Sequence, residues 1–573
     1  MILIEIRLIL DCSDQNLGIT KGSCGRRRDS GMIVRAFTAI SRLQGRVKAT
    51  EKISQAVRKG VTKRRSVKKS SSVWKNSESC DSSKQVELFT FIKFNIVEER
   101  AEVLESRQSA NPKVKHMLCL SNGHGEDTIA VSVLKELMVI VGERGQKIDV
   151  KALALVGAGS AYHQNGIQTL GPSKVMPSGG FIYMDILQLL GDVRAGLLSL
   201  TIDQWQTIVR WLDTTPDAFI LAVGDIFPLA LAWLASIHEK KKHKRVLQYA
   251  FIGTAKSEFY IQDNSESNFS VRRRFHVESL LGGVYLPWER AIMADSNCRL
   301  VAPRDGLTVE VLRKRLPSHA RNKVQDLGNP MMDGLDPSGC LNFLEKFEQG
   351  HCITILPGSR PPEVHANWRL LLEASKEVSN QLKQKFVVYI VPIVPSLEPG
   401  PFYDSLLEAG WEPYWSVSKH LHSCHAANAI SKEEHRSRSE LWPANNGVCI
   451  LQFQKDNAVM LLLRGGFSDA CFYAETAIAM AGTGTEQLVG LGKPVFTLPG
   501  SGPQFTYAFA EAQSRLLGKS IFLCSNPRSL GVQLAEVLDD QDSFWTFVNN
   551  GTERMGSPGS SRRIANEILN VIR

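Results

Sequence analysis

The chain has 573 residues, 43% of them hydrophobic, which suits a globular protein of two or three domains. Residues 1–75 hold 18 Lys and Arg against 5 Asp and Glu, so their charge of +13 exceeds the +10 of the whole chain and leaves −3 for the rest. The eleven cysteines form no CxxC pair, which argues against a zinc ribbon and a disulfide framework.

Residues 1–110 are predicted to be a basic, disordered N-terminal arm. Read from Met32, the segment MIVRAFTAISRLQGRVKA has no acidic residue before Glu51, a composition typical of an organelle transit peptide. A solvated arm is the alternative. A nucleic-acid-binding arm is disfavoured, because no aromatic residues interleave the charges, and no nucleic-acid partner is expected.

Short apolar runs alternate with helical patterns in the first part of the globular region, which indicates parallel βαβ units. The run HMLCL predicts a strand at 116–120, and an apolar stripe predicts a helix that ends at Gly142. Further strands are expected at 150–156, 218–223, 246–252 and 299–302.

The stretch FILAVGDIFPLALAWLASI, residues 219–237, approaches the length of a membrane span. Because Asp225 and Pro228 interrupt it, we interpret it as a strand, a turn and a buried helix. Integral membrane insertion is therefore not expected.

A second series begins at His351 with strands in CITILPGSR, FVVYIVPIV, VCILQF and TAIAMAG, a helix at 485–491 and a strand at 495–498. The Pro- and Gly-rich segment 327–339 between the two series suits a hinge. We expect an α/β, GT-B-like fold class: two doubly wound Rossmann-like domains facing a central cleft, with an acceptor domain at 111–330 and a donor domain at 331–573.

The polar stretch 416–446 is expected to be an insertion in the second domain. It contains His420, His422, Cys424 and His425, but structural zinc sites usually draw ligands from two separated knuckles. We therefore expect no metal in this protein, and no cofactor.

Glycine loops follow several of the expected strands. LSNGHGED, residues 120–127, lacks the third glycine of a dinucleotide-binding loop, and no carboxylate follows the second strand to hold a ribose. A Walker A loop also fails, because Gln513 replaces its first glycine.

The richest motif is AMAGTGTEQ, where a strand runs into Gly482, Thr483, Gly484 and Thr485 at the start of a helix. Its backbone N–H groups and hydroxyls could hold a diphosphate, whereas tight turns are the alternative role of the glycines. Glu486 and Gln487 could bind sugar or ribose hydroxyls, Gln504 precedes another helix, and Ser359 with Arg360 ends the first strand of the same domain. Arginine can clamp a phosphate, or lie on the surface after a turn.

These motifs together resemble the lipid-A-disaccharide synthases, and more closely their cyanobacterial and plant relatives. The resemblance runs from about Lys115 to the C-terminus and rests on LSNGHGED, PDAFILAVGD, LGNPMMD, ILPGSR, AGTGTEQ and GPQF. It implies a GT-B fold, a UDP-sugar held mainly by the second domain through Arg360 and residues 482–485, and transfer to a lipid-linked acceptor without metal. Gln487 stands where the synthases have a glutamate, with Glu486 one position earlier.

The resemblance also maps Asp225 onto an essential aspartate of the synthases. A carboxylate at the end of a buried strand should have a raised pKa and could deprotonate an acceptor, although it could simply cap the next helix. His124 and Glu126 are the competing bases, in an acceptor-side loop with Asn122, Gly123 and Gly125. His124 departs from the synthase motif and matches the comparable loop of peptidoglycan and galactolipid glycosyltransferases.

The sequence thus predicts a metal-independent, inverting glycosyltransferase that uses a UDP-sugar donor and a lipid-linked or apolar acceptor. The alternatives are a UDP-sugar epimerase of the same fold and a catalytically inactive binding protein. Resemblance to cyanobacterial sequences favours a chloroplast over a mitochondrion, with the protein soluble or in peripheral contact with a membrane.

Overall fold

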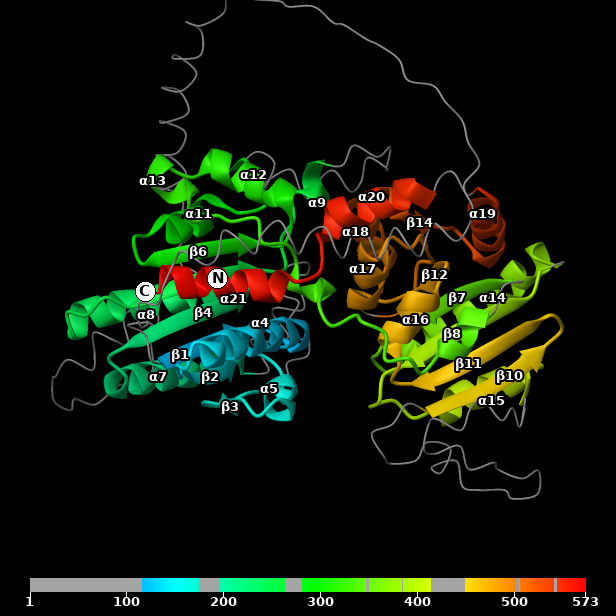
Figure 1. The fold of residues 1–573 in the computed structure, drawn as a ribbon, viewed down its shortest axis with the longest axis horizontal. Helices are drawn as coiled ribbons and strands as arrows, with labels where there is room; N and C mark the ends of the chain where they lie inside the picture. The colour runs from blue at the N-terminus through cyan, green and yellow to red at the C-terminus, as the bar shows by residue number, and fades with distance from the viewer. Residues whose placement is uncertain are drawn as a thin grey trace, which may run out of the picture. The chain divides into compact units, whose positions relative to one another are not determined.

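The computed structural model describes residues 116–174, 196–262, 281–346, 350–383, 385–413, 449–500, 502, 505–540 and 544–572. The predicted N-terminal arm and the predicted insertion at 416–446 lie outside these ranges. Within them the chain builds two β-sheets, each covered by helices (Figure 1).

The first sheet has six parallel strands in the order β3-β2-β1-β4-β5-β6. The central strand β4 is buried along its whole length, which explains its continuous apolar sequence AFILAVG. The strand bounds are β1 His116–Ser121, β2 Asp149–Ala154, β3 Gln168–Thr169, β4 Ala218–Gly224, β5 Gln248–Gly253 and β6 Cys298–Pro303.

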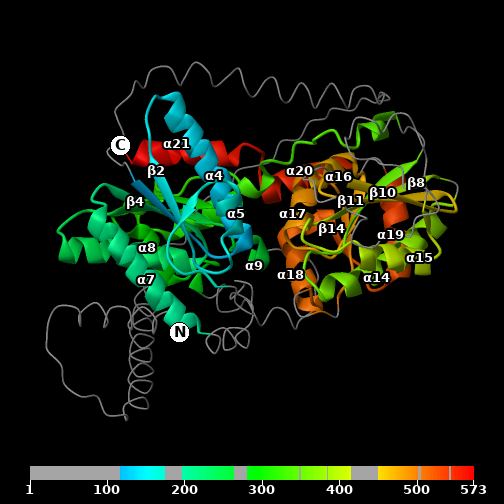
Figure 2. The same cartoon turned by 90° about the horizontal axis from the view of Figure 1, so that it is seen from below.

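Helices connect these strands, and the first sheet packs against α4 in one apolar core. Figure 2 shows α4 and α21 together on one side of the sheet, and α7 and α8 on the other. The bounds are α4 His124–Glu143, α5 Ser160–Gln164, α7 Leu197–Thr214, α8 Ile226–Lys242, α9 Phe259–Gln262, α11 Pro287–Ala294, α12 Gly306–Arg315 and α13 Ser318–Arg321.

The second sheet has eight strands in the order β14-β13-β12-β7-β8-β11-β10-β9. Neighbours from β14 to β11 are parallel, whereas β10 pairs antiparallel with both β11 and β9. The bounds are β7 His351–Leu356, β8 Val387–Ile393, β9 Glu412–Pro413, β10 Cys449–Lys455, β11 Ala458–Arg464, β12 Thr476–Ala479, β13 Val495–Thr497 and β14 Ile521–Leu523.

Helices α14 and α19, among those that follow these strands, bury their apolar faces against this second sheet. The core includes the fully buried Trp368 of α14 and Leu530 of α19. The bounds are α14 Glu363–Gln381, α15 Gly400–Glu408, α16 Phe467–Tyr473, α17 Thr483–Gly490, α18 Tyr507–Leu517, α19 Pro527–Asp539, α20 Phe544–Met555 and α21 Ser560–Val571, with 3₁₀ turns η1 Pro330–Met332, η2 Asn342–Lys346 and η4 Gly518–Ser520.

The last helix, α21, packs against α4 of the first sheet although it follows the second sheet in sequence. Asp333 of the linker between the sheets fixes its start, since its carboxylate accepts hydrogen bonds from the backbone N–H groups of Gly559, Ser560 and Ser561. A carboxylate is favourable there because it meets the unpaired donors of a helix N-terminus. The predicted domain boundary at 330/331 stays a prediction, and the structure adds that α21 shares the core of the first sheet.

The expected α/β, GT-B-like fold class is confirmed. The predicted strands are confirmed as well, and most of their ends agree with the structure within one or two residues. The structure adds that VCILQF, a predicted strand, is half of an antiparallel hairpin, in which β10 and β11 flank Asp456 and Asn457. Asp456 has a φ of 50°, the left-handed conformation that a two-residue hairpin turn requires.

The stretch 219–237 forms β4 and most of α8, which meet at Asp225, as predicted. In the part of the chain that the structure describes, no helix combines the length and the apolar content that crossing a bilayer requires.

Candidate active site

The carboxyl ends of β1 and β4 lie side by side at the centre of the first sheet. The chain order reverses between these two strands, because β1 leads outward to β2 and β3 while β4 leads outward to β5 and β6. Such switch points are where open α/β sheets bind ligands. The turn after β1 contains Asn122 and Gly123, and Asp225 directly follows Gly224, the last residue of β4, so the predicted acceptor loop and the predicted base lie together.

Asp225 is the N-cap of α8, and its Oδ1 accepts a hydrogen bond from the backbone N–H of Phe227 at 2.9 Å. The side-chain amide of Asn122 also hydrogen-bonds this carboxylate. Both contacts lower its pKa, as does the charge of Lys256, but burial outweighs them and raises the pKa above the usual value for aspartate. Asp225 therefore has both properties that the sequence offered as alternatives, since it caps a helix and is poised to take up a proton.

Glu126 lies in the first turn of α4, next to the end of β4. A Cβ atom added to Gly224 would lie 3.3 Å from its Cγ, so the glycine leaves room for the glutamate side chain. Burial, with contributions from the charges of Asp225, Asp127 and Glu486, raises the pKa of Glu126 to about 7. A carboxyl group that titrates near neutrality can both donate and accept a proton.

The pair Lys256 and Glu289 supports the site from the next strand. Lys256 follows β5 and its Nζ lies 2.6 Å and 2.7 Å from the two carboxylate oxygens of Glu289 on α11; both side chains are buried. The two charges act on Asp225 with opposite signs. The sequence analysis missed this pair, although a lysine three residues after a buried strand was a usable signal.

The second sheet also has a switch point, between β7 and β12. The backbone N–H of Met480, after β12, donates to the carbonyl of Leu356, at the end of β7. Gly358 has a φ of 102°, and a Cβ there would lie 3.2 Å from the carbonyl oxygen of Met480. The predicted donor loops therefore lie against each other, and Ser359 and Arg360, which follow Gly358, are exposed.

Helix α17 begins at Thr483, so Thr483 and Gly484 belong to the helix rather than to the preceding loop. No side chain caps its first turn at Gly482, which leaves backbone N–H groups for a ligand. Thr483 is exposed, whereas the buried Thr485 hydroxyl donates to the Ala481 carbonyl at 2.7 Å. Of the two hydroxyls that were predicted to hold a diphosphate, that of Thr483 is therefore the accessible one.

The side chains that follow in α17 already have protein partners. Glu486 accepts a hydrogen bond from Nη2 of Arg304 at 2.7 Å, and Gln487 donates to the carbonyl of Met331 in the linker at 2.8 Å. From α18, Gln513 donates to the carbonyls of Ala481 and Gly482. Sequence analysis missed Arg304 and this role of Gln513.

Two predicted site residues are not fully described. Gln504 lies outside the described residues, and the structure places only the backbone of His124, at the start of α4. Gly125 is an exposed residue of the same helix turn.

One group of potential metal ligands lies elsewhere among the described residues. Asp213, His238 and His243 bring ligand atoms within 4.8 Å of one another. Asp213 already pairs with Lys242 at 2.8 Å. Lys242 and His243 belong to the basic segment KKKHKR at residues 240–245, and this positive charge makes the group unsuited to a cation.

No protein-family model matches the chain, and no curated protein matches its sequence. Solved structures do resemble it at low identity. A UDP-GlcNAc 2-epimerase from Neisseria meningitidis bound to UDP-GlcNAc is 13% identical, with a TM-score of 0.41 over 79% of this chain and 100% of that one. MurG from Acinetobacter baumannii is 13% identical, with a TM-score of 0.40 over 80% and 99%. Spinosyn rhamnosyltransferase SpnG complexed with thymidine diphosphate is 13% identical, with a TM-score of 0.39 over 79% and 99%.

Proposed function

We propose that the protein is an inverting, metal-independent glycosyltransferase that moves a sugar from a UDP-sugar to a lipid-linked or apolar acceptor. The observation that carries this proposal is the composition of the two switch points. At one, two carboxyl groups with raised pKa values, Asp225 and Glu126, are held together. At the other, an uncapped helix start lies against a loop with an exposed arginine, which suits a diphosphate.

The reaction follows from these groups. Asp225 takes the proton of an acceptor hydroxyl, whose oxygen attacks C1 of the sugar. The bond between C1 and the phosphate oxygen breaks, and its electron pair leaves with UDP. The backbone N–H groups at the start of α17, with Arg360, stabilise the charge that develops on the diphosphate. Attack from the face opposite UDP inverts the configuration at C1.

The apolar or lipid-linked nature of the acceptor rests on the motif resemblance alone, as does the lipid-A-disaccharide-synthase-like activity. Contact with a membrane surface is part of this proposal, since the acceptor would be presented there.

A UDP-sugar epimerase is the second candidate, and the pair of Glu126 and Asp225 favours it. An epimerase removes a proton and returns it to the opposite face, so two carboxyl groups with raised pKa values suit that chemistry as well. It would need no acceptor.

One assay separates these candidates. The purified chain is incubated with a panel of UDP-sugars, with and without a lipid extract, and UDP and the sugar products are quantified. We expect UDP release that rises with the extract. An isomerised sugar without UDP release would identify an epimerase, and the absence of both, with no UDP binding, would leave a binding protein and contradict the transferase.

We also propose that the basic N-terminal arm is a transit peptide that directs the protein to the chloroplast and is removed there. Its support is compositional, namely the acid-free stretch after Met32. Mass spectrometry of the mature N-terminus tests it, and an intact Met1 in the organelle would contradict it.

A further inference from the structure

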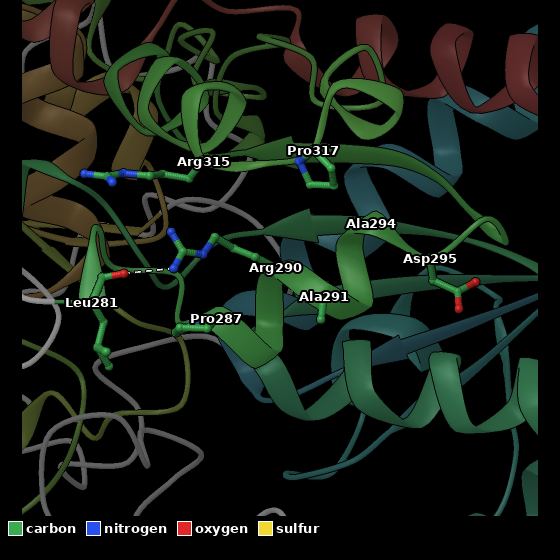
Figure 3. A pocket seen from close by; sticks show the side chains of 8 residues that line it. All are labelled: Leu281, Pro287, Arg290, Ala291, Ala294, Asp295, Arg315 and Pro317. Atoms are coloured by element: carbon green, nitrogen blue, oxygen red, sulfur yellow. Dashed lines mark hydrogen bonds between the residues drawn. The ribbon is translucent and has the colours of Figure 1, made fainter. Parts of the chain in front are cut away.

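A hollow of ≈ 660 Å³ lies beside α11 on the first-sheet part of the molecule (Figure 3). It lies between α11 and the segment that runs from the end of α12 into Pro317. Its volume is in the range of small-molecule sites, roughly 300–1,000 Å³. None of the residues that line it belongs to the candidate active site, so it requires an explanation of its own.

Two guanidinium groups converge on one end of this hollow. Arg290 of α11 donates from Nη2 to the carbonyl of Leu281 at 2.8 Å and from Nη1 to that of Gly282 at 3.4 Å. A Cβ added to Gly282 would lie 3.0 Å from Cζ of Arg315, the last residue of α12. Figure 3 shows both side chains extending to the same side of the hollow. The two cations therefore flank the same short stretch of backbone.

The positive charge of this pair is not matched by an ion pair. Among the described residues neither arginine forms a salt bridge, and Glu289, the carboxylate next to Arg290 in sequence, pairs with Lys256 instead. Burial and the neighbouring Arg315 lower the pKa of Arg290, and they outweigh the charges of Glu258 and Glu289, which act in the opposite direction. An anion bound between them would relieve this repulsion.

The remaining lining is mostly apolar. It includes Leu281, Pro287, Ala291 and Pro317, with the single carboxylate of Asp295 at the α11 C-terminus.

We propose that this hollow is a binding site for an amphiphile with a phosphate group, in which Arg290 and Arg315 hold the phosphate and the apolar wall beside Ala291 holds its hydrocarbon part. Guanidinium groups bind phosphate through paired, charge-assisted hydrogen bonds, and two of them can share its oxygens. Because the rest of the wall is mostly apolar, a free phosphate ion would occupy only the end of the hollow beside the two arginines. This inference does not depend on the proposed transferase activity.

The test uses the full chain and calorimetric titration with dihexanoyl phosphatidic acid below its micelle concentration. Glycerol 3-phosphate and inorganic phosphate test the headgroup alone, and dihexanoylglycerol tests the apolar part alone. Arg315→Gln and Arg290→Gln each remove one guanidinium. Lys314→Gln is the matched control, because it removes a charge from the same helix while Lys314 pairs with Glu310 and does not line the hollow.

We expect the phosphatidic acid to bind at least about tenfold more tightly than glycerol 3-phosphate, and each arginine variant to weaken it about tenfold, the loss typical of one charge-assisted contact. Lys314→Gln should leave it within about twofold. Arg290→Lys keeps the positive charge at this position. The thermal unfolding of each variant is measured alongside, so that a loss of binding caused by misfolding is recognised. Native binding by a double variant that carries both Arg290→Gln and Arg315→Gln, an equal loss in Lys314→Gln, or equal binding of inorganic phosphate and the amphiphile would each overturn the proposal.

Discussion

Arg304 and Glu486 form an ion pair of 2.7 Å that joins the turn after β6 in the first sheet to the first turn of α17 in the second. The side chain of Arg304 is 4% exposed and that of Glu486 is 13% exposed, so both charges are withdrawn from water. Glu486 is also one of the charges that raise the pKa of Glu126. This pair therefore joins the start of the candidate donor-binding helix to the first sheet, and its glutamate acts electrostatically on Glu126.

Replacing Glu486 by glutamine should leave the Arg304 cation buried without a counter-charge. Breaking a buried ion pair by removing one partner costs several kcal/mol, because the remaining charge is not solvated. We expect the free energy of unfolding to fall by about 3 kcal/mol in urea denaturation.

Two variants control this experiment. Glu310→Gln breaks an exposed pair with Lys314 on α12 and should have no measurable effect. The double variant Arg304→Met with Glu486→Leu removes both charges and should regain part of the lost stability. If Glu486→Gln is as stable as the native protein, the pair does not form in solution.

Two substitutions separate the capping role of Asp225 from its proposed role as a base. Asparagine is a good N-cap, so Asp225→Asn should fold normally and bind UDP while turnover falls by about 10²–10⁴-fold. Asp225→Ala should lose turnover equally and also about 1 kcal/mol of stability. Initial rates, UDP titration and denaturation are measured on the same preparations. Native turnover in Asp225→Asn would exclude the aspartate as the base.

Stability should fall as pH rises through the interval where Glu126 titrates. The pKa of Glu126 is about 7 in the folded protein and 4.5 in an unfolded chain, so between these values the unfolded chain binds fewer protons and unfolding becomes more favourable with rising pH. The full shift corresponds to roughly 3 kcal/mol. Asp127, whose pKa is raised to about 6, acts in the same direction.

The measurement is urea denaturation at pH values from 5 to 8 on the native protein and Glu126→Gln. The glutamine variant should be less sensitive to pH and more stable than the native protein above pH 7. Glu143→Gln, at the exposed end of the same helix, is the control and should keep the native profile. Identical profiles for the native protein and Glu126→Gln would show that Glu126 is not the titrating group.

The strands at the two switch points could be predicted because buried parallel strands appear as uninterrupted apolar runs, and the glycines after β1, β7 and β12 mark the turns. The strands next to them in each sheet, β2, β5, β8 and β13, could be predicted for the same reason. The β10–β11 hairpin was missed although it carried a signal, since Asp456 and Asn457 separate the alternating segment CILQFQK from the apolar segment AVMLLLR.

The charge pairs of the site could not be predicted in this way. Arg304 and Glu486 are 182 residues apart in sequence, and Lys256 and Glu289 are 33 apart, so nothing in local spacing relates them. Their pairing depends on how helices pack across and between sheets. Periodicity therefore identified which residues lie at the strand ends, whereas the side chain that each one meets required the structure.

Gly484→Ala tests the proposed diphosphate site without changing any polar group. A Cβ at this position would lie 2.9 Å from Cδ1 of Leu356, so either the buried Leu356 side chain or α17 must shift. Overpacking of this kind costs about 1–3 kcal/mol. Because this repacking disturbs the junction between the start of α17 and the end of β7, where the diphosphate is proposed to bind, we expect the Kd for UDP, measured by calorimetry, to rise roughly tenfold, or by 1.4 kcal/mol.

Gly125→Ala is the matched control, since it makes the same change in the first turn of α4, where a Cβ would meet nothing within 4 Å. Alanine is a better helix former than glycine by about 1 kcal/mol, so this variant should be slightly more stable and bind UDP as the native protein does. A native Kd in Gly484→Ala would place the diphosphate elsewhere. An equal loss in Gly125→Ala would show that UDP contacts α4 and not α17 alone.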